Sequence, residues 1–517
     1  MAGEGHADLL LTNAQVLTMD PGTASAGFVA VKGGKILGVG DEGEAASFTG
    51  PGTKEMDCQG MALLPGFNDA HCHLMAFASS LRGVDCRRDS AGSIFQIVRA
   101  IRSEARKVPD GTWIRGFGYD EFYLTEKRHP TRSDLDQAAP SHPVRLDHRT
   151  GHGSVLNSLA LRLVGISADT PDPPEGVIER AEGGEPTGVL YEMGDFLRRG
   201  SEAPQGEGNR LEGIRRANTL LLSSGITSLQ DASPGNDPAR WHAFKRLTEE
   251  GYLTPRVTMM AGAPHLQKFL DAGLKPGSGD ERLRVGAVKI MLTLTTGALH
   301  PPREELDRLV LDAHKRGLQV AIHAVEEAAV EAAVEAILNA QTASPMLQLR
   351  HRIEHCSECP PLLLKKLVNS RAMVVTQPSF IYHNGERYRS QVEEPLLPFL
   401  YPLGSLAKGG VVVAAGSDAP VAYPHPLLDI CSAVTRWTQG GSPFFPDQAI
   451  PVDAALRMQT VTGAYVSGEE RLKGSVSAGR LADLVLLNAD PTTTEPEAIG
   501  EIKVMMTMLG GEVVWQR

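Results

Sequence analysis

The stretch LQVAIHAVEEAAVEAAVEAIL, residues 318–338, contains two structural periods in succession. Residues 318–323 form a short apolar run of the kind found in buried strands. From Val325 onward, apolar residues recur at three- and four-residue spacing, while Glu327, Glu331 and Glu335 fall on a different face. The stretch therefore predicts a strand followed directly by an amphipathic helix.

The same strand signal recurs along the middle of the chain. The candidate strands are residues 66–71, 226–230, 256–260, 287–292, 320–323, 351–355, 373–377 and 411–415. Helical patterns lie between several of them, as in residues 303–316, which follow two prolines and end at a glycine. Eight strands alternating with helices predict an α/β chain with a parallel (β/α)8 TIM barrel.

Two regions do not fit a plain barrel. About 150 residues separate the first two strands, far more than a normal βα connection, so we expect an insert over about residues 75–210. Both ends of the chain are rich in strand patterns (8–19, 28–39, 481–489 and 502–516). We expect residues 1–64 and 471–517 to form one small β-sandwich domain, and residues 65–470 to form the barrel with its insert.

The composition narrows the class of protein. The chain has 517 residues, 42% of them hydrophobic and 22% charged, with a formal net charge of -11. An acidic balance argues against a nucleic-acid partner. We see no apolar run of about eighteen residues and no signal-peptide pattern, so we expect a cytoplasmic protein without membrane contact. Six cysteines in so long a chain are no disulfide framework.

Polar residues gather where the predicted strands end. TIM-barrel enzymes place their active sites at the carboxyl ends of the strands. In LLPGFNDAHCHLM, residues 63–75, the first strand ends in His71 and His73, which are two apart and can share a face. The other strands of interest add Lys289, His323, His355 and Asp418.

Each of these residues alone fits a structural or capping role. Their convergence at one barrel mouth instead predicts a divalent metal site, since imidazole and carboxylate are ligands of Zn²⁺ and similar ions. Lys289 is unusual because an unpaired lysine in a buried strand is costly, so it must be paired, neutral or chemically altered.

Further residues are candidates for substrate binding. They are His152, Tyr119 and Asp120 in the insert, and Tyr382 and His383 in the segment 379–388, which we expect to be a mobile lid loop. A structural or capping role for His152, and a solvated loop for the others, remain alternatives. Arg352 is expected to be structural, because it lies on the face opposite His355.

These motifs resemble those of the amidohydrolase superfamily of metal-dependent hydrolases. LLPGFNDAHCHL resembles the strand-1 motif, and AIHA, RIEHC and GSDAPV resemble the motifs of strands 5, 6 and 8. GFGYDEF, GHGSVLNSLAL, TGVLYE and GITSLQDA resemble the branch that contains N-substituted formamide deformylase. The resemblance spans nearly the whole chain.

The resemblance implies one or two divalent ions, with Zn²⁺ expected. His71, His73 and Asp418 would hold the first ion, and His323 and His355 the second. Lys289 matches a lysine that superfamily members carboxylate with CO₂ to form a bridging carbamate. The resemblance also suggests a homodimer.

The expected reaction is hydrolysis of a C–N bond in a small molecule: an amide, N-formyl group, carbamate or cyclic amide. A metal-activated water would attack, with Asp418 as general acid and base. Ester hydrolysis, decarboxylation or isomerisation on the same site, and a non-catalytic binding protein, are the alternatives. The branch commonly has Asp-Gly soon after the lysine, but here residues 288–302 read VKIMLTLTTGALHPP without that Asp. Substrate preference therefore does not carry over.

Overall fold

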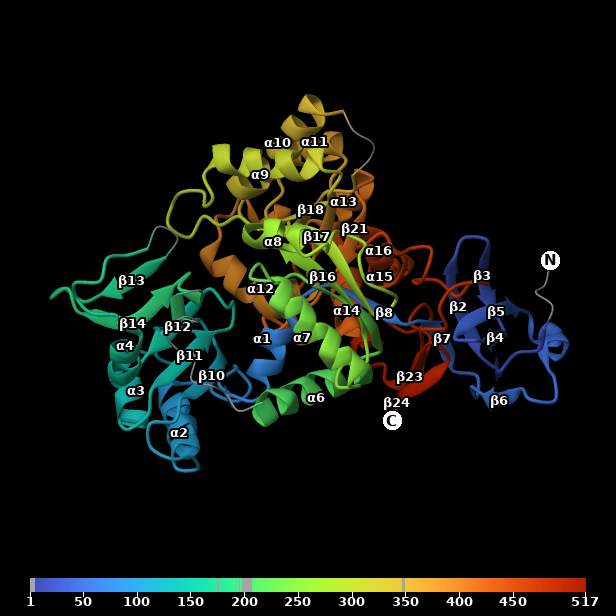
Figure 1. Cartoon of the computed structure of the whole chain (residues 1–517), viewed down its shortest axis with the longest axis horizontal. Helices are drawn as coiled ribbons and strands as arrows, with labels where there is room; N and C mark the ends of the chain where they lie inside the picture. Colours follow the sequence, from blue (N-terminus) through green and yellow to red (C-terminus); the bar gives the residue numbers. More distant parts are fainter. Residues whose placement is uncertain (1–4, 174–175, 195, 198–206, 346–348) are drawn as a thin grey trace.

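The computed structural model describes residues 5–173, 176–194, 196–197, 207–345 and 349–517. Three β-containing regions lie side by side (Figure 1). The barrel is in the middle, the insert is on one side, and the sheets built from the two termini are on the other. Within the described ranges, no helix has both the length and the apolar character needed to cross a membrane.

The central sheet has eight parallel strands in the order β21-β20-β19-β18-β17-β16-β15-β8. The strands are β8 (Phe67–Cys72), β15 (Ile226–Asp231), β16 (Arg256–Gly262), β17 (Leu283–Met291), β18 (Val320–Ala324), β19 (Arg352–His355), β20 (Met373–Thr376) and β21 (Val413–Ala415). Each overlaps one predicted strand, so the predicted barrel is confirmed.

The barrel closes just beyond its last strand. The Asp418 backbone N–H donates to the His71 carbonyl at 2.7 Å, and the His73 N–H donates to the Ala419 carbonyl at 2.9 Å. The seam between the first strand and the segment after the last one therefore runs through the predicted site.

Helices surround the barrel. They are α6 (Glu207–Ser223), α7 (Pro238–Glu249), α8 (Leu266–Asp271), α9 (Arg303–Lys315), α10 (Glu327–Ala343), α11 (Pro361–Ser370), α12 (Ser379–Gln391), α13 (Leu403–Lys408), α14 (Pro426–Thr435), α15 (Val452–Met458) and α16 (Val461–Val466). Helix α10 buries Val330, Val334, Ile337 and five of its alanines (Ala329, Ala332, Ala333, Ala336 and Ala340) in the core. Its Glu331 and Glu335 both accept from Lys366 of α11, at 2.7 and 2.8 Å. The strand–helix unit predicted from residues 318–338 is confirmed.

The terminal segments form two sheets, ordered β5-β4-β1-β6 and β24-β23-β22-β7-β2-β3. The strands are β1 (Leu9–Thr12), β2 (Gln15–Asp20), β3 (Thr23–Ala26), β4 (Phe28–Lys32), β5 (Lys35–Gly40), β6 (Lys54–Asp57), β7 (Ala62–Pro65), β22 (Leu484–Leu487), β23 (Val504–Leu509) and β24 (Glu512–Gln516). Strands from both ends share the second sheet, which agrees with a β domain of mixed origin. The limits at residues 64 and 471 stay a prediction.

The insert after β8 begins with α1 (Leu74–Ser80) and has its own sheet, ordered β13-β14-β12-β11-β10-β9. Its strands are β9 (Val84–Asp85), β10 (Ile114–Tyr119), β11 (Val144–His148), β12 (Gly153–Leu156), β13 (Val177–Arg180) and β14 (Pro186–Tyr191), and its helices are α2 (Ile94–Ala105), α3 (Arg132–Ala138) and α4 (Ser158–Val164). The end predicted near residue 210 borders residues 198–206, which lie outside the described residues.

The lid loop predicted at residues 379–388 is wrong, because this segment is helix α12. Phe380, Ile381, Asn384 and Gly385 lie on its buried side at helical spacing. At its start, the Ser379 N–H donates to the buried Asp429 carboxylate at 3.1 Å. Tertiary packing therefore makes a helix of a sequence with weak helical propensity.

Candidate metal centre and surrounding cleft

The six predicted ligand residues come from five barrel strands or their carboxyl ends. His71 belongs to β8, and His73 follows it as the residue preceding α1. Lys289 lies in β17, His323 in β18 and His355 at the end of β19. Asp418 follows β21. The structure thus brings all six to the same end of the barrel.

The side chains lie close together. Oδ1 of Asp418 is 3.1 Å from His73 Nε2 and 3.5 Å from His71 Nε2. The His71 ring centroid is 4.8 Å from that of His355, which is 4.5 Å from that of His323. Ligand atoms of His71, His355 and Asp418 all fall within 4.8 Å of one another, a spacing that could hold one ion.

Several buried polar atoms in this cluster have no hydrogen-bond partner among the residues the structure describes. They are Nε2 of His71, Nε2 of His355 and Nζ of Lys289. Buried polar atoms are normally satisfied, and leaving one unpaired is costly. The two imidazole nitrogens fit a divalent cation, which would accept their lone pairs, and the Lys289 amine could do so only in its uncharged form.

The backbone at two of these positions is left-handed, with φ of 71° at His355 and 56° at Asp418. Non-glycine residues seldom adopt this conformation, and functional sites often retain it. Gly416 lies in the same turn, and a Cβ there would be 2.4 Å from the His71 backbone nitrogen. Only glycine lets the turn that carries Asp418 approach β8 this closely.

Burial keeps the histidines neutral. It lowers the pKa of His71 to about 3, with the Lys289 charge adding to the effect. Burial also lowers the pKa of His355, and it holds that of His323 well below its usual value. Neutral imidazole is the form that binds a metal.

The pKa of Asp418 moves downward. Burial alone would raise it, but the hydrogen bond from His73 and the electrostatic interactions with His355, His71 and His73 together outweigh burial and lower the pKa. The carboxylate is therefore ionised at neutral pH. Lys289 is 1% exposed, and burial lowers its pKa to about 8, so part of the population has a neutral, nucleophilic amine.

A second layer of side chains holds the histidines. Glu354, fully buried, contacts Nδ1 of His71. Arg352 in turn forms a buried ion pair with Glu354 and donates to Gln230 and to the Ala70 carbonyl. Arg352 and Glu354 are two residues apart on β19, so both point into the barrel. Arg352 is thus structural as predicted, but it supports the site directly.

The other ligands have partners of their own. His355 Nδ1 is 2.8 Å from Gln377 Oε1, and His73 Nδ1 is 3.3 Å from Ser233 Oγ. Asp69 accepts from the Ser417 hydroxyl at 2.6 Å and from the Ser417 N–H at 2.9 Å, which ties the Asp418 turn to β8. These hydrogen-bond partners were not predicted from the sequence. The signal that could have found them is a polar residue within an apolar strand, such as Asp69 or Glu354.

The insert brings His152 to the mouth of the barrel. Its ring centroid is 5.8 Å from that of His323, and its Nδ1 is 2.8 Å from Glu192 Oε1. Burial lowers the pKa of His152, but the hydrogen bond to Glu192 and the negative charges of Glu192, Asp418 and Glu326 together outweigh burial and raise that pKa. His152 therefore lies beside the predicted ligands, whereas Glu192 was not predicted.

Tyr119 and Asp120 lie elsewhere. Tyr119 is fully buried in the core of the insert, and its hydroxyl is 2.9 Å from His129 Nδ1. Asp120 forms ion pairs with Arg149 at 2.7 Å and Arg387 of α12 at 2.9 Å. The expectation that these two side chains line the pocket is not met, because packing and ion pairs occupy them.

Asp120, Glu121 and His148 form a second cluster with metal-ligand chemistry. Its carboxylates are already neutralised: Glu121 lies 2.8 Å from Arg387 and 2.9 Å from His148. We interpret this cluster as an ion-pair network between the insert and α12. Tyr382 and His383 of α12 lie near it, since the Tyr123 hydroxyl donates to the His383 carbonyl at 3.1 Å.

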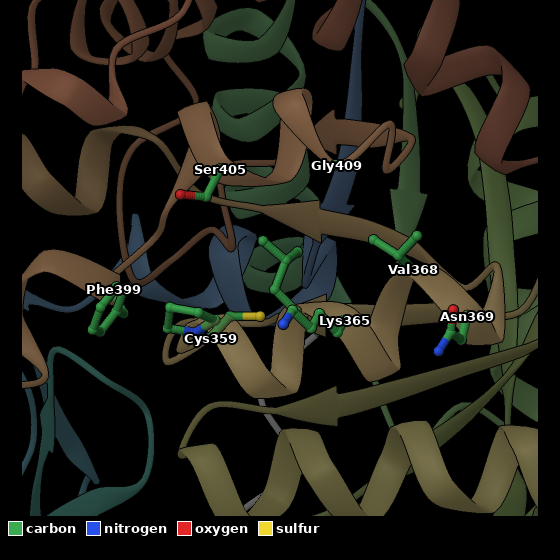
Figure 2. Close-up of a pocket in the computed structure, with 9 residues that line it drawn as sticks. Cys359, Lys365, Val368, Asn369, Phe399, Ser405 and Gly409 are labelled. Atoms are coloured by element: carbon green, nitrogen blue, oxygen red, sulfur yellow. The ribbon is translucent and has the colours of Figure 1, made fainter.

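A cavity of about 530 Å³ lies beside helices α11 and α13 (Figure 2). Residues Cys359, Lys365 and Val368 line one side, and Ser405 of α13 and Gly409, which directly follows α13, line the other. None of the predicted site residues lines it.

Known proteins with similar sequences and structures have been compared with this chain. The model of the family described as "Amidohydrolase family" matches residues 54–515.

The chain belongs to the amidohydrolase family.

Among relatives of this amidohydrolase, N-substituted formamide deformylase of Arthrobacter pascens is 30% identical, covering 99% of this chain and 98% of that protein. The putative amidohydrolase YtcJ of Bacillus subtilis is 27% identical over 95% of this chain and 96% of that protein. An uncharacterised metal-dependent hydrolase from Pyrococcus horikoshii has a similar structure, with a TM-score of 0.76 and 26% identity over 94% of this chain and 99% of that chain. The family and the ligand cluster together support a divalent metal.

Proposed function

We propose that this amidohydrolase cleaves a C–N bond of a small molecule (an amide, N-formyl group, carbamate or cyclic amide) at a metal centre held by the six residues at the barrel mouth. The observation that carries the proposal is the convergence of buried, unpartnered nitrogens of His71, His355 and Lys289 beside an ionised Asp418, within the described part of the chain. The name of the formamide deformylase relative supports a substrate of the amide class.

We propose His71, His73, His323, His355 and Asp418 as the metal ligands, with Zn²⁺ as the expected ion. Lys289 is proposed to be carboxylated, because an uncharged buried amine can react with CO₂ and its carbamate would supply a further anionic ligand. A bound divalent ion supplies Lewis acidity and lowers the pKa of a water molecule.

The protein's own residues then move the proton and hold the geometry. Asp418, ionised because of the surrounding histidines, is proposed to take the proton of the attacking water and return it to the leaving nitrogen. Glu354 and Arg352 fix the orientation of His71 from behind. His152, Tyr382 and His383 are proposed to face the substrate.

The test is a substrate screen. Metal-replete protein is incubated with N-formyl amines, N-acyl amines, carbamates and cyclic amides, and acid and amine products are measured together. We expect stoichiometric formation of acid and amine groups in at least one class, and turnover lower by orders of magnitude in Asp418→Asn. Products without added water would instead indicate decarboxylation or isomerisation. Turnover of esters alone would move the reaction to ester hydrolysis.

The carbamate has its own test. Protein equilibrated with ¹³C-bicarbonate should show a carbamate carbon signal that Lys289→Met lacks. An identical spectrum for the two proteins would contradict carboxylation. Six free cysteines, five of them buried, support the further proposal of a reducing, cytoplasmic location. The homodimer stays a prediction from the resemblance.

A further inference from the structure

Two residues of the insert form a pair at the edge of the barrel mouth. His152 precedes β12, and Glu192 directly follows β14. The Glu192 N–H donates to the His152 carbonyl at 2.8 Å. Glu192 has a φ of 52°, a left-handed conformation that a glutamate adopts at a cost. The paired strands β12 and β14 therefore hold the Glu192 side chain in a defined direction.

The direction of the Glu192 side chain decides which nitrogen of His152 is free. Oε1 of Glu192 is 2.8 Å from Nδ1 of His152, so Nδ1 is occupied and Nε2 remains for another group. The imidazole ring is 5.8 Å from that of His323. Its side chain keeps 37% of its surface exposed, whereas His323 is buried. His152 thus borders both the metal centre and open space.

Glu192 also contacts the barrel. The Thr295 hydroxyl donates to the same Oε1 at 2.8 Å. Thr295 lies in the segment after β17, the strand that carries Lys289. This is the segment VKIMLTLTTGALHPP, which lacks the Asp-Gly of the resembling branch. Oε1 of Glu192 therefore links the insert to the barrel segment whose sequence departs from the branch pattern.

We propose that His152 is a catalytic residue that contacts the amide-type substrate through Nε2, and that Glu192 is the positioning residue that holds His152 over the metal centre. The inference rests on the proposed function. It makes the insert a part of the active site: the substrate lies between the metal centre and the His152 ring. An ion pair that only anchors β12 to β14 would show the same contact, so the experiment separates positioning of His152 from anchoring of the two strands.

A double-mutant cycle makes that separation. Glu192→Gln, His152→Gln and the double variant are compared in kcat and KM on the best substrate of the screen. Misplacing a positioned group can cost about 10²-fold in rate, so we expect losses of about 10- to 10²-fold for Glu192→Gln and at least as much for His152→Gln. Residues that act as a unit are strongly non-additive, so the double variant should match His152→Gln alone.

Two controls test whether the losses come from the His152–Glu192 pair and not from loss of metal or from a general effect of removing a glutamate. Metal content, measured by mass spectrometry of the protein solution, should equal that of the wild type in all three variants. Glu185→Gln is the matched control: Glu185 is an exposed glutamate of the same subdomain, paired with Arg132 at 3.3 Å, and its loss should leave kcat and KM unchanged. Additive losses in the cycle, or a Glu192→Gln variant with wild-type kcat/KM, would overturn the proposal.

The outcome is distinguishable from failure of the proposed function. If the loaded wild type turns over no C–N substrate, the proposed function fails and the catalytic role of His152 falls with it. The positioning role is then read from ¹⁵N-histidine spectra, with His152→Gln used for assignment. The Nδ1 resonance of His152 should shift in Glu192→Gln and not in Glu185→Gln. An unshifted resonance in Glu192→Gln would overturn positioning as well.

Discussion

Two groups of buried histidines lie at opposite ends of the barrel strands, and they differ in one respect. At the carboxyl end, Nε2 of His71 and of His355 lack hydrogen-bond partners among the described residues. At the other end, His351 precedes β19 and is 2.8 Å from His314 of α9. There, Val320 N–H donates to His351 Nδ1 at 3.1 Å, and His314 Nε2 lies 2.7 Å from the Ser344 carbonyl. Every ring nitrogen of that pair is satisfied.

The electrostatics of the two groups are similar. Burial lowers the pKa of His351 to about 4, with His314 adding to it, and lowers that of His71 to about 3. Both histidines are therefore neutral at pH 7. Burial and a shifted pKa therefore do not distinguish a candidate ligand from a structural histidine here. The difference is that the candidate ligands have an Nε2 atom without a hydrogen-bond partner among the described residues.

We expect the largest effect on turnover from a substitution at the carboxyl end of the barrel strands, where the candidate ligands lie. Asp418→Asn removes the proposed proton acceptor, whose contribution is typically about 10²- to 10⁴-fold in turnover. We expect kcat to fall by that factor while much of the bound metal remains, as measured by steady-state kinetics and metal analysis. Asp429→Asn, a buried aspartate outside the ligand cluster, is the control. Near-wild-type kcat in Asp418→Asn would remove it from this role.

Acid should lower the free energy of unfolding through the His351–His314 pair at the other end of the strands. The native pKa of His351, near 4, lies below its unfolded value near 6.5, so its contribution to stability is complete above pH 6.5 and is lost as the pH falls toward 4. At about 1.4 kcal/mol per pKa unit, this amounts to at most about 3.5 kcal/mol. Urea unfolding of wild type and His351→Leu between pH 7 and 4 measures it. Equal pH slopes for the two proteins would contradict the expectation.

A smaller loss, in metal affinity, is expected when Glu354, the partner of His71, is changed. Glu354→Gln keeps the shape of the side chain but removes the charge that holds His71 Nδ1. Changes in such outer partners typically weaken metal binding about 10- to 100-fold. Competition with a chelator of known affinity should show this loss in Glu354→Gln and no change in Gln341→Glu, a substitution on α10 far from the ligands. Wild-type affinity in Glu354→Gln would mean that His71 needs no carboxylate.

The smallest effect is expected at the ion pairs between the insert and α12. Arg387→Lys can keep only one of the contacts to Asp120 and Glu121, which are 2.9 and 2.8 Å away. We expect a loss of about 0.5–1.5 kcal/mol in unfolding free energy. The charges of this network are paired with one another and not with the candidate ligands, so metal content should not change. A loss of metal in Arg387→Lys would show that the two regions are coupled.

The barrel and the six candidate ligands could be predicted because both depend on local patterns. An apolar strand such as Val320–Ala324, followed by a helix with a periodic apolar face, encodes its own structure. Barrel topology then places the strand ends at one mouth, whatever the intervening sequence.

The remaining features depend on contacts between distant segments. Glu354 meets His71 only because of the registers of β19 and β8 within the closed barrel. Helix α12 contains Asn384 and Gly385, which disfavour helices, and forms through burial against its neighbours. The approach of Glu192 to His152 requires the fold of the whole insert. No periodicity in the sequence carries this information.

The seam of the barrel has a consequence for assembly. His71 and Asp418 sit on its two sides, and the backbone bond from Asp418 to His71 joins them. An ion held by both side chains binds the closed barrel and has no comparable site in the open one. By mass action, each tenfold rise in free metal above its dissociation constant then adds about 1.4 kcal/mol to closure. Loss of the ion would remove this contribution and leave the seam held by its backbone hydrogen bonds.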